Sequence, residues 1–255
     1  MMKYLQKLGK AIMLPVAVLP VAAIMMGIGY AMCPATMQGG DVTGIIQIIG
    51  FALVKIGSAV IDKLPMLFAV GVAIGLSKDQ HGAAGLAGLV AFLTVTTVLN
   101  SGVVATMMGA EEAPLAFTKI DNAFIGIISG ITASVGYNKF SSAQLPTALA
   151  FFSGKRCVPI VTSFVMVAES AILYFVWPML FNALVWVGEQ IMGLGPVGAG
   201  LYAFANLLLI PTGLHHALNA VFWFDIAGIA DINKFWGFAE GGIKGVTGMY
   251  QAGFF

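Results

Sequence analysis

Charge is scarce in this sequence. Only 9% of the 255 residues are Asp, Glu, Lys or Arg, 59% are hydrophobic, and the mean hydropathy is +0.95. An average soluble domain has about a quarter of its residues charged. This composition leaves too little charge to cover a water-facing surface, so it excludes a soluble globular enzyme.

The sequence also lacks an excess of charge of either sign. Lys and Arg total 12 and Asp and Glu total 11, which gives a formal net charge of +1. No basic stretch is interleaved with aromatic residues. A nucleic-acid-binding surface needs a concentrated positive field, so nucleic acid is excluded as a partner.

Motifs that carry catalysis or bind metal are missing as well. The two cysteines, Cys33 and Cys157, form no Cys-x-x-Cys pair and lie beside apolar runs, which predicts small packing residues. The sequence has no Gly-x-Ser-x-Gly, Walker phosphate loop or His-Glu-x-x-His. We therefore expect no catalytic residue, no metal site and no cofactor in these residues.

Long apolar runs, by contrast, are abundant. A helix that crosses the hydrocarbon core needs about 20 mostly apolar residues. Runs of this kind lie at about 11–33, 43–77, 82–108, 120–137, 157–187 and 197–224. They predict an all-α membrane protein, a polytopic transmembrane helix bundle. The first run ends without a small-x-small cleavage site, so we expect it to be retained as a helix.

The run at 43–77 is too long for one straight span. It contains Asp62, Lys63 and Pro65, and a proline removes a helical hydrogen-bond donor. This pattern predicts a helix followed by a bent or interfacial continuation.

Basic residues predict the orientation, because Lys and Arg concentrate in cytoplasmic loops. If the segments alternate, one side of the membrane receives Lys3, Lys7, Lys10, Lys78, Lys139, Lys155 and Arg156. The opposite loops contain Asp41, Glu111, Glu112 and a single basic residue, Lys119. We therefore expect a cytoplasmic N-terminus.

The segment from 138 to 156, NKFSSAQLPTALAFFSGKR, is polar at both ends and apolar in the middle. A segment of this kind can lie in the plane of the membrane interface. We expect an amphipathic cytoplasmic element here.

Glycines follow one another at short helical spacing in HGAAGLAGLVAF, where Gly82, Gly85 and Gly88 occur. Small residues at this spacing allow helices to approach closely without lipid between them. Dense helix packing is therefore predicted around this segment.

The stretch from 206 to 224, NLLLIPTGLHHALNAVFWF, predicts a broken or re-entrant helical hairpin. Pro211 removes a donor and Gly213 tolerates strained backbone angles, so the helix should stop and restart. Broken helices at membrane depth occur only where protein or a water-filled cavity surrounds them, and polar groups there often line a substrate path. The alternative is that one histidine of this stretch caps the helix and the other faces solvent. The predicted substrate contacts are His215, His216, Asn219, Thr212, Gly213 and Asn206.

Two further polar features allow more than one interpretation. Glu169 lies inside the apolar run VMVAESAIL, where it is either a buried, protonated packing contact, which we favour, or part of a proton or substrate path. The stretch from 225 to 244 is polar, aromatic and glycine-rich, so it suits a loop that closes over a sugar, with Asp231 and Asn233 as loop contacts, or it is an ordinary connection.

Several stretches occur in the order known for one family. They are LQKLGKAIMLPVAVLPVAAI, KLPMLFAVGVAIGLSKDQHGAAGLAG, GKRCVPIVT, LLIPTGLHHALN, ADINKFW and GMYQAGFF. On these stretches, the sequence resembles the enzyme IIC component of the bacterial sugar phosphotransferase system, glucose superfamily, and most of all its N-acetylglucosamine-specific members.

This resemblance implies transport coupled to phosphorylation in the bacterial inner membrane. An N-acetylglucosamine-like or glucose-like hexose would enter a site in the membrane, and a phosphorylated enzyme IIB cysteine would supply the phosphate. It also implies a homodimer in contact with membrane lipid. Residues 1–190 would form the dimerisation part, and 191–255 would form a broken hairpin and loop that contribute to the sugar site, with His215 matching the family histidine.

The sequence departs from the family pattern in several places. It has no Cys-x-x-Arg-Leu-Arg phosphorylation motif and no Gly-x-Thr-Glu-Pro hairpin, whose glutamate helps to bind sugar in the family. Leu207 follows Asn206 where an arginine is usual, and Glu169 occupies a position that is normally apolar. The alternative expectation is a truncated, non-transporting membrane module that pairs with or regulates a complete enzyme IIC.

Overall fold

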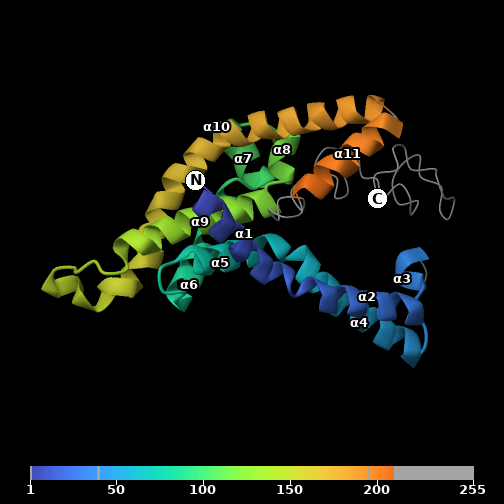
Figure 1. Cartoon of the computed structure of the whole chain (residues 1–255), viewed down its shortest axis with the longest axis horizontal. Helices are drawn as coiled ribbons and strands as arrows, with labels where there is room; N and C mark the ends of the chain where they lie inside the picture. The colour runs from blue at the N-terminus through green and yellow to red at the C-terminus, as the bar shows by residue number, and fades with distance from the viewer. Residues whose placement is uncertain (1, 39–40, 195, 210–255) are drawn as a thin grey trace.

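A computed structural model describes residues 2–38, 41–194 and 196–209, and its elements are helical throughout these ranges (Figure 1). The α-helices are α1 (Met2–Val16), α2 (Leu19–Met32), α3 (Ala35–Gln38), α4 (Ile45–Asp62), α5 (Leu64–Leu76), α6 (Gly82–Val98), α7 (Ser101–Met108), α8 (Leu115–Thr118), α9 (Ala123–Phe140), α10 (Cys157–Gly193) and α11 (Pro196–Leu209). Two 3₁₀ turns, η1 (Thr147–Phe152) and η2 (Gly154–Arg156), connect α9 to α10. The all-α prediction is confirmed.

Three helical stretches of the described chain are long and apolar enough to cross a membrane: Gln6–Met32, Ile45–Asp62 and Gly154–Ala183. A fourth span arises if α6 and α7 are counted together. Length and apolarity of this kind are typical of membrane-spanning helices, so the prediction of a polytopic membrane protein is confirmed.

The predicted apolar segment at 82–108 forms two helices with a break between them. α6 and α7 are bent by 48° at a short break. Asn100 begins the new helix, because its side-chain oxygen accepts a hydrogen bond from the Gly102 N–H at 3.0 Å. An asparagine cap satisfies a backbone donor that a continuous helix would have paired internally.

The predicted break in the run at 43–77 is confirmed. α4 ends at Asp62, and Lys63 stands between it and α5, which has Pro65 in its first turn. Proline is tolerated there because its missing N–H is not needed by the helix. α5 is not interfacial, since its side chains Phe68 and Val72 are fully buried.

α5 lies at the centre of the bundle and contacts α1, α6 and α9 (Figure 1). α10 packs along α6 and α9, and the indole N–H of Trp177 donates a 2.6 Å hydrogen bond to the Ala116 carbonyl in α8. α2 and α4 contact mainly each other and project away from the rest of the helices. The core is therefore concentrated around α5, α6, α9 and α10.

Glycine and alanine bring these helices together. A Cβ atom added at Gly88 of α6 would lie only 2.5 Å from the Ala69 carbonyl oxygen of α5, and one at Gly85 would lie 2.8 Å from Ile74. The predicted close packing is confirmed at both positions. It is wrong for Gly82, where an added Cβ would meet nothing within 4 Å.

Both cysteines are free and buried, Cys33 at 0% and Cys157 at 6% exposure. Cysteine often serves as a small apolar residue in a core. The prediction of packing residues is confirmed.

The segment from 138 to 156, predicted as an amphipathic element, is divided in the structure between the end of α9 and an irregular connection. Its first residues continue α9 to Phe140, and the remainder, residues 141–156, forms what we call the arm. The Gly154 N–H donates to the Ala143 carbonyl at 2.8 Å, and the Leu145 N–H donates to the Ser153 hydroxyl at 3.0 Å. These bonds close the arm into a compact loop whose η1 turn has no buried residue.

Replacing Gly88 by Val should destabilise the protein by about 1–3 kcal/mol, because the added atoms would collide with backbone that cannot move freely. The midpoint of thermal unfolding in detergent, followed by differential scanning fluorimetry, would measure the loss. Gly82→Ala is the matched control, since its Cβ enters open space. Equal midpoints for the two variants would contradict the close approach of α5 and α6.

Candidate functional site

Most of the predicted sugar contacts lie outside the described residues: Thr212, Gly213, His215, His216, Asn219, Asp231 and Asn233. Asn206 is described, on the last turns of α11. The assignments of the other residues stay predictions.

Asn206 is a polar residue in an otherwise apolar part of α11. Its side chain is half-buried, and its Oδ1 atom is buried without a hydrogen-bond partner in the described structure, whereas the neighbouring Leu207 and Leu208 are exposed. Buried polar atoms in proteins are nearly always paired. The Asn206 side-chain oxygen therefore stands out, because it has no hydrogen-bond partner among the described residues.

Glu169 lies on α10 and is partly buried, with the hydroxyl group of Thr132 on α9 close by. Its Oε1 atom is buried without a hydrogen-bond partner in the described structure. Thr162, two turns earlier on α10, lies over Gly136 of α9, where an added Cβ would be 3.5 Å from its Oγ1 atom. Glu169 thus faces α9, which packs on α10. A packing contact between helices is the interpretation that the sequence favours.

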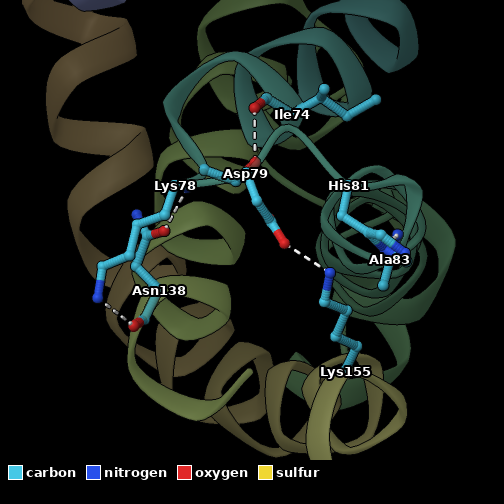
Figure 2. Close-up of polar contacts among 8 residues, drawn as sticks. Ile74, Lys78, Asp79, His81, Ala83, Asn138 and Lys155 are labelled. Carbon is cyan, nitrogen blue, oxygen red and sulfur yellow. Dashed lines mark hydrogen bonds and ion pairs between the residues drawn. The ribbon is translucent and has the colours of Figure 1, made fainter. Parts of the chain in front are cut away.

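A polar cluster lies where α5 ends and α6 begins (Figure 2). The Lys155 ammonium group of η2 pairs with the Asp79 carboxylate at 2.5 Å. The Tyr137 hydroxyl group of α9 lies close to this pair, although the Tyr137 side chain is buried. Three segments that are distant in the sequence are joined here.

Asn138 holds the same loop from the other side (Figure 2). Its Oδ1 atom accepts a 2.8 Å hydrogen bond from the Lys78 N–H, and its Nδ2 atom donates to the Leu76 carbonyl at 3.1 Å. The Lys78 ammonium group donates a 3.2 Å hydrogen bond to the backbone carbonyl of Asn138. The side chain of Asn138 therefore fixes the end of α5 against the end of α9.

His81 caps α6, and its Nδ1 atom accepts a 3.1 Å hydrogen bond from the Ala83 N–H. A side-chain acceptor at this position satisfies a donor that the helix leaves unpaired. His81 therefore has a structural task in the loop.

The ion pair changes the titration of Asp79. The hydrogen bond from Lys155, and next the nearby Tyr137 hydroxyl group, lower the pKa of Asp79 from 3.8 to about 2. Because the pKa of Asp79 is lowered on folding, its stabilising effect is complete above pH 3.8 and is lost as the pH falls through about 2. The pair is intact at neutral pH.

The sequence prediction missed this cluster. Asp79 and Lys155 are separated by 76 positions, and Lys155 entered the prediction only as an orientation signal. The available signal was that both residues belong to stretches that carry the family resemblance, KLPMLFAVGVAIGLSKDQHGAAGLAG and GKRCVPIVT.

The described residues contain no group of three or more His, Cys, Asp or Glu side chains that could hold a metal ion. The amide side chain of Asn206 is of a type that can form hydrogen bonds to a neutral, hydroxyl-bearing ligand. The polar groups around Asp79 instead join loops of the protein to one another.

Lys155→Gln should remove the ion pair and speed amide hydrogen exchange in residues 77–81, as measured by mass spectrometry, because the loop loses its tie to η2. Lys139→Gln is the matched control, since it removes a nearby positive charge that stacks on Phe140 instead. High salt should reproduce part of the effect in the unaltered protein. Equal exchange in the two variants would contradict a tie through Lys155.

Comparison with known proteins supplies the family. The family profile described as "Phosphotransferase system, EIIC" matches residues 9–255. The N-acetylglucosamine-specific EIICB component of Bacillus subtilis is 39% identical over 100% of this chain and 50% of its own length. The N-acetylglucosamine-specific EIICBA component of Escherichia coli is 37% identical over 99% of this chain and 35% of its own length.

Relatives with other stated specificities also match. The maltose-specific EIICB component of Escherichia coli is 32% identical over 89% of the chain and 46% of its own length. The chain thus spans about half the length, or less, of these curated relatives. With the apolar helices and the profile match over almost all of its length, the chain belongs to the EIIC family of the phosphotransferase system, whose members are proteins of the bacterial inner membrane.

Proposed function

We propose that this chain contributes to the translocation of an N-acetylglucosamine-like or glucose-like hexose, which an enzyme IIB domain or protein then phosphorylates. The observation that carries the proposal is the similarity to N-acetylglucosamine-specific relatives along the whole chain. Relatives named as glucose-specific and glucosamine-specific are 35% and 38% identical. They favour a hexose as the substrate without selecting one hexose among these.

The residues proposed to contact the sugar have the chemistry that a hexose requires. Imidazole and amide groups of His215, His216 and Asn219 can each donate and accept hydrogen bonds with sugar hydroxyl groups. The buried, unpartnered Oδ1 atom of Asn206 supports a role on the same ligand, because a hydroxyl donor would satisfy it. Thr212 and Gly213 would shape the backbone beside the ligand, and Asp231 and Asn233 would contact it from a loop.

The phosphoryl group comes from outside these residues in this proposal. The 255 residues contain no Cys-x-x-Arg-Leu-Arg motif, whereas relatives such as the Bacillus subtilis EIICB component carry an EIIB part in their names. The phosphoryl group would pass from the enzyme IIB cysteine to a hexose hydroxyl group: the O–P bond forms as the S–P bond breaks, the cysteine leaves as a thiolate, and the hydroxyl proton is released to water. The membrane chain would bind and orient the hexose.

The orientation proposed from the basic residues is an N-terminus in the cytoplasm. The Lys155–Asp79 ion pair supports one part of it, because it joins two loops that the alternation of spans assigns to the same side. An ion pair between loops on opposite sides of a bilayer could not form. The enzyme IIB partner would approach from this side.

A homodimer is proposed for residues 1–190. The projecting α2 and α4 expose a series of large apolar side chains that lipid or a second copy must cover: Val21, Ile24, Ile28, Ile45, Ile46, Ile48, Ile49 and Ile56.

A second candidate function is a non-transporting module that pairs with a complete enzyme IIC through the same helices. Co-purification with a tagged full-length relative would favour this module if mixed dimers form without any hexose uptake by the chain.

His215→Gln should weaken hexose binding by about tenfold or more, as expected for the loss of one hydrogen bond in a membrane-embedded site. Equilibrium binding of labelled N-acetylglucosamine to the purified chain, with unlabelled glucose as competitor, would measure the affinity and the preference. His81→Gln is the matched control, because that histidine caps α6. Unchanged binding in both variants, or no saturable binding of either sugar by the unaltered chain, would contradict the proposal.

Asn206→Leu should lower hexose affinity by about tenfold without lowering the midpoint of thermal unfolding, because leucine has a similar shape and leaves no acceptor unpaired. The two measurements separate a ligand contact from a packing residue. A lower midpoint with unchanged affinity would assign Asn206 to packing.

A further inference from the structure

The arm, residues 141–156, exposes apolar side chains between two helices of the bundle. Leu149 is 50% exposed, Phe151 is 70% exposed and Phe152 is 41% exposed. Figure 1 shows the arm extending beyond the ends of α6 and α9. Adjacent large apolar side chains outside a core usually mark a surface that contacts something other than water.

Basic residues lie at both ends of the arm in the chain, and one of them contacts an exposed aromatic ring. Lys139 lies at the end of α9, and the Arg156 guanidinium group lies 4.7 Å from the centre of the Phe151 ring while donating a 3.2 Å hydrogen bond to the Phe151 carbonyl. The stretch from 138 to 156 contains no acidic residue. Asp79 balances Lys155 only, so the root of the arm keeps a net positive charge.

A hollow of about 670 Å³ lies within the arm. Its lining is rich in small, hydroxyl and amide side chains: Ser142, Ala143, Gln144, Leu145, Thr147, Ala150, Ser153 and Gly154. Hydroxyl, amide and backbone N–H groups of this kind can donate hydrogen bonds to phosphate oxygens. The hollow lies next to Lys155 and Arg156 in the chain.

We propose that the arm binds an anionic phospholipid at the surface of the cytoplasmic leaflet. Leu149, Phe151 and Phe152 reach into the boundary between headgroups and acyl chains, while Arg156 and Lys139 hold the phosphate beside the hollow. Apolar side chains next to basic ones are the combination that binds anionic membrane surfaces.

The position of the arm favours lipid over a soluble protein as the occupant. Both of its ends continue directly into α9 and α10, and α10 belongs to a helical stretch long and apolar enough to cross a membrane. The Asp79–Lys155 pair ties the end of the arm to the loop between α5 and α6, and two further hydrogen bonds close the arm. The choice of the cytoplasmic leaflet rests on the orientation proposed above, whereas the binding of an anionic lipid does not depend on which sugar the chain transports.

The test places an environment-sensitive fluorophore on Leu149→Cys in the full chain, where the native Cys33 and Cys157 are buried and react slowly. The protein is reconstituted in vesicles of phosphatidylcholine, with or without phosphatidylglycerol, that carry brominated acyl chains. We expect bromine quenching in both vesicles and stronger quenching with phosphatidylglycerol. Arg156→Gln should weaken the apparent affinity for phosphatidylglycerol by about fivefold, the effect of one basic residue near an anionic surface.

Lys55→Gln is the matched control, because Lys55 also lies over a phenylalanine ring, Phe51 on α4, but far from the arm in the chain. It should leave the quenching unchanged. The proposal would be overturned if the fluorophore stayed in water in both kinds of vesicle, or if quenching were equal with and without phosphatidylglycerol. Equal effects of Arg156→Gln and Lys55→Gln would overturn it as well. Protection of the fluorophore only after phosphorylated enzyme IIB is added would overturn it too, in favour of a protein-docking surface.

Discussion

Three helices meet at the Ala69 carbonyl group of α5, and the rest of the bundle depends on that meeting. A Cβ atom added at Gly88 of α6 would lie 2.5 Å from this oxygen, and one added at Gly130 of α9 would lie 2.8 Å from it. Only glycine leaves room for both neighbours. Without a hydrophobic driving force between helices in lipid, close packing of this kind supplies much of the attraction between them.

This close contact determines which loops come together. Because α5, α6 and α9 pack side by side, the end of α5, the start of α6 and the end of α9 lie next to one another, and short polar side chains can join them. Asn138 fixes Lys78 and Leu76, and Lys155 reaches Asp79 from η2. The small residues of the core thus create the conditions for the polar cluster at its edge, and that cluster in turn holds the root of the arm.

The two places for which we propose a function both rest on this framework. Asn206 presents an unpaired acceptor on α11, which packs on α10, and α10 in turn packs on α6 and α9. The arm lies between α9 and α10 with its aromatic and basic side chains outside the core. Membership of the EIIC family gives both places a common setting, a protein of the bacterial inner membrane.

The sequence by itself determined the class of this protein. Apolar runs and scarce charge required membrane-spanning helices, Pro65 beside Lys63 located the break between α4 and α5, and the ordered motifs indicated the family that the profile match confirms. Composition is a property of the whole sequence, and a helix break at proline depends on residues next to one another in the chain. Both can therefore be recognised without coordinates. The motif around His215 was visible in the same way, although its geometry lies outside the described residues.

Only the tertiary structure decided the remainder. The bend at Asn100, the burial of α5, the open space at Gly82 and the pairing of Asp79 with Lys155 were all missed or predicted differently. Each depends on which helices become neighbours and how closely they approach. A sequence pattern repeats along one helix, whereas close packing and an ion pair across 76 positions arise between helices, and their energies depend on distances that exist only in the folded chain.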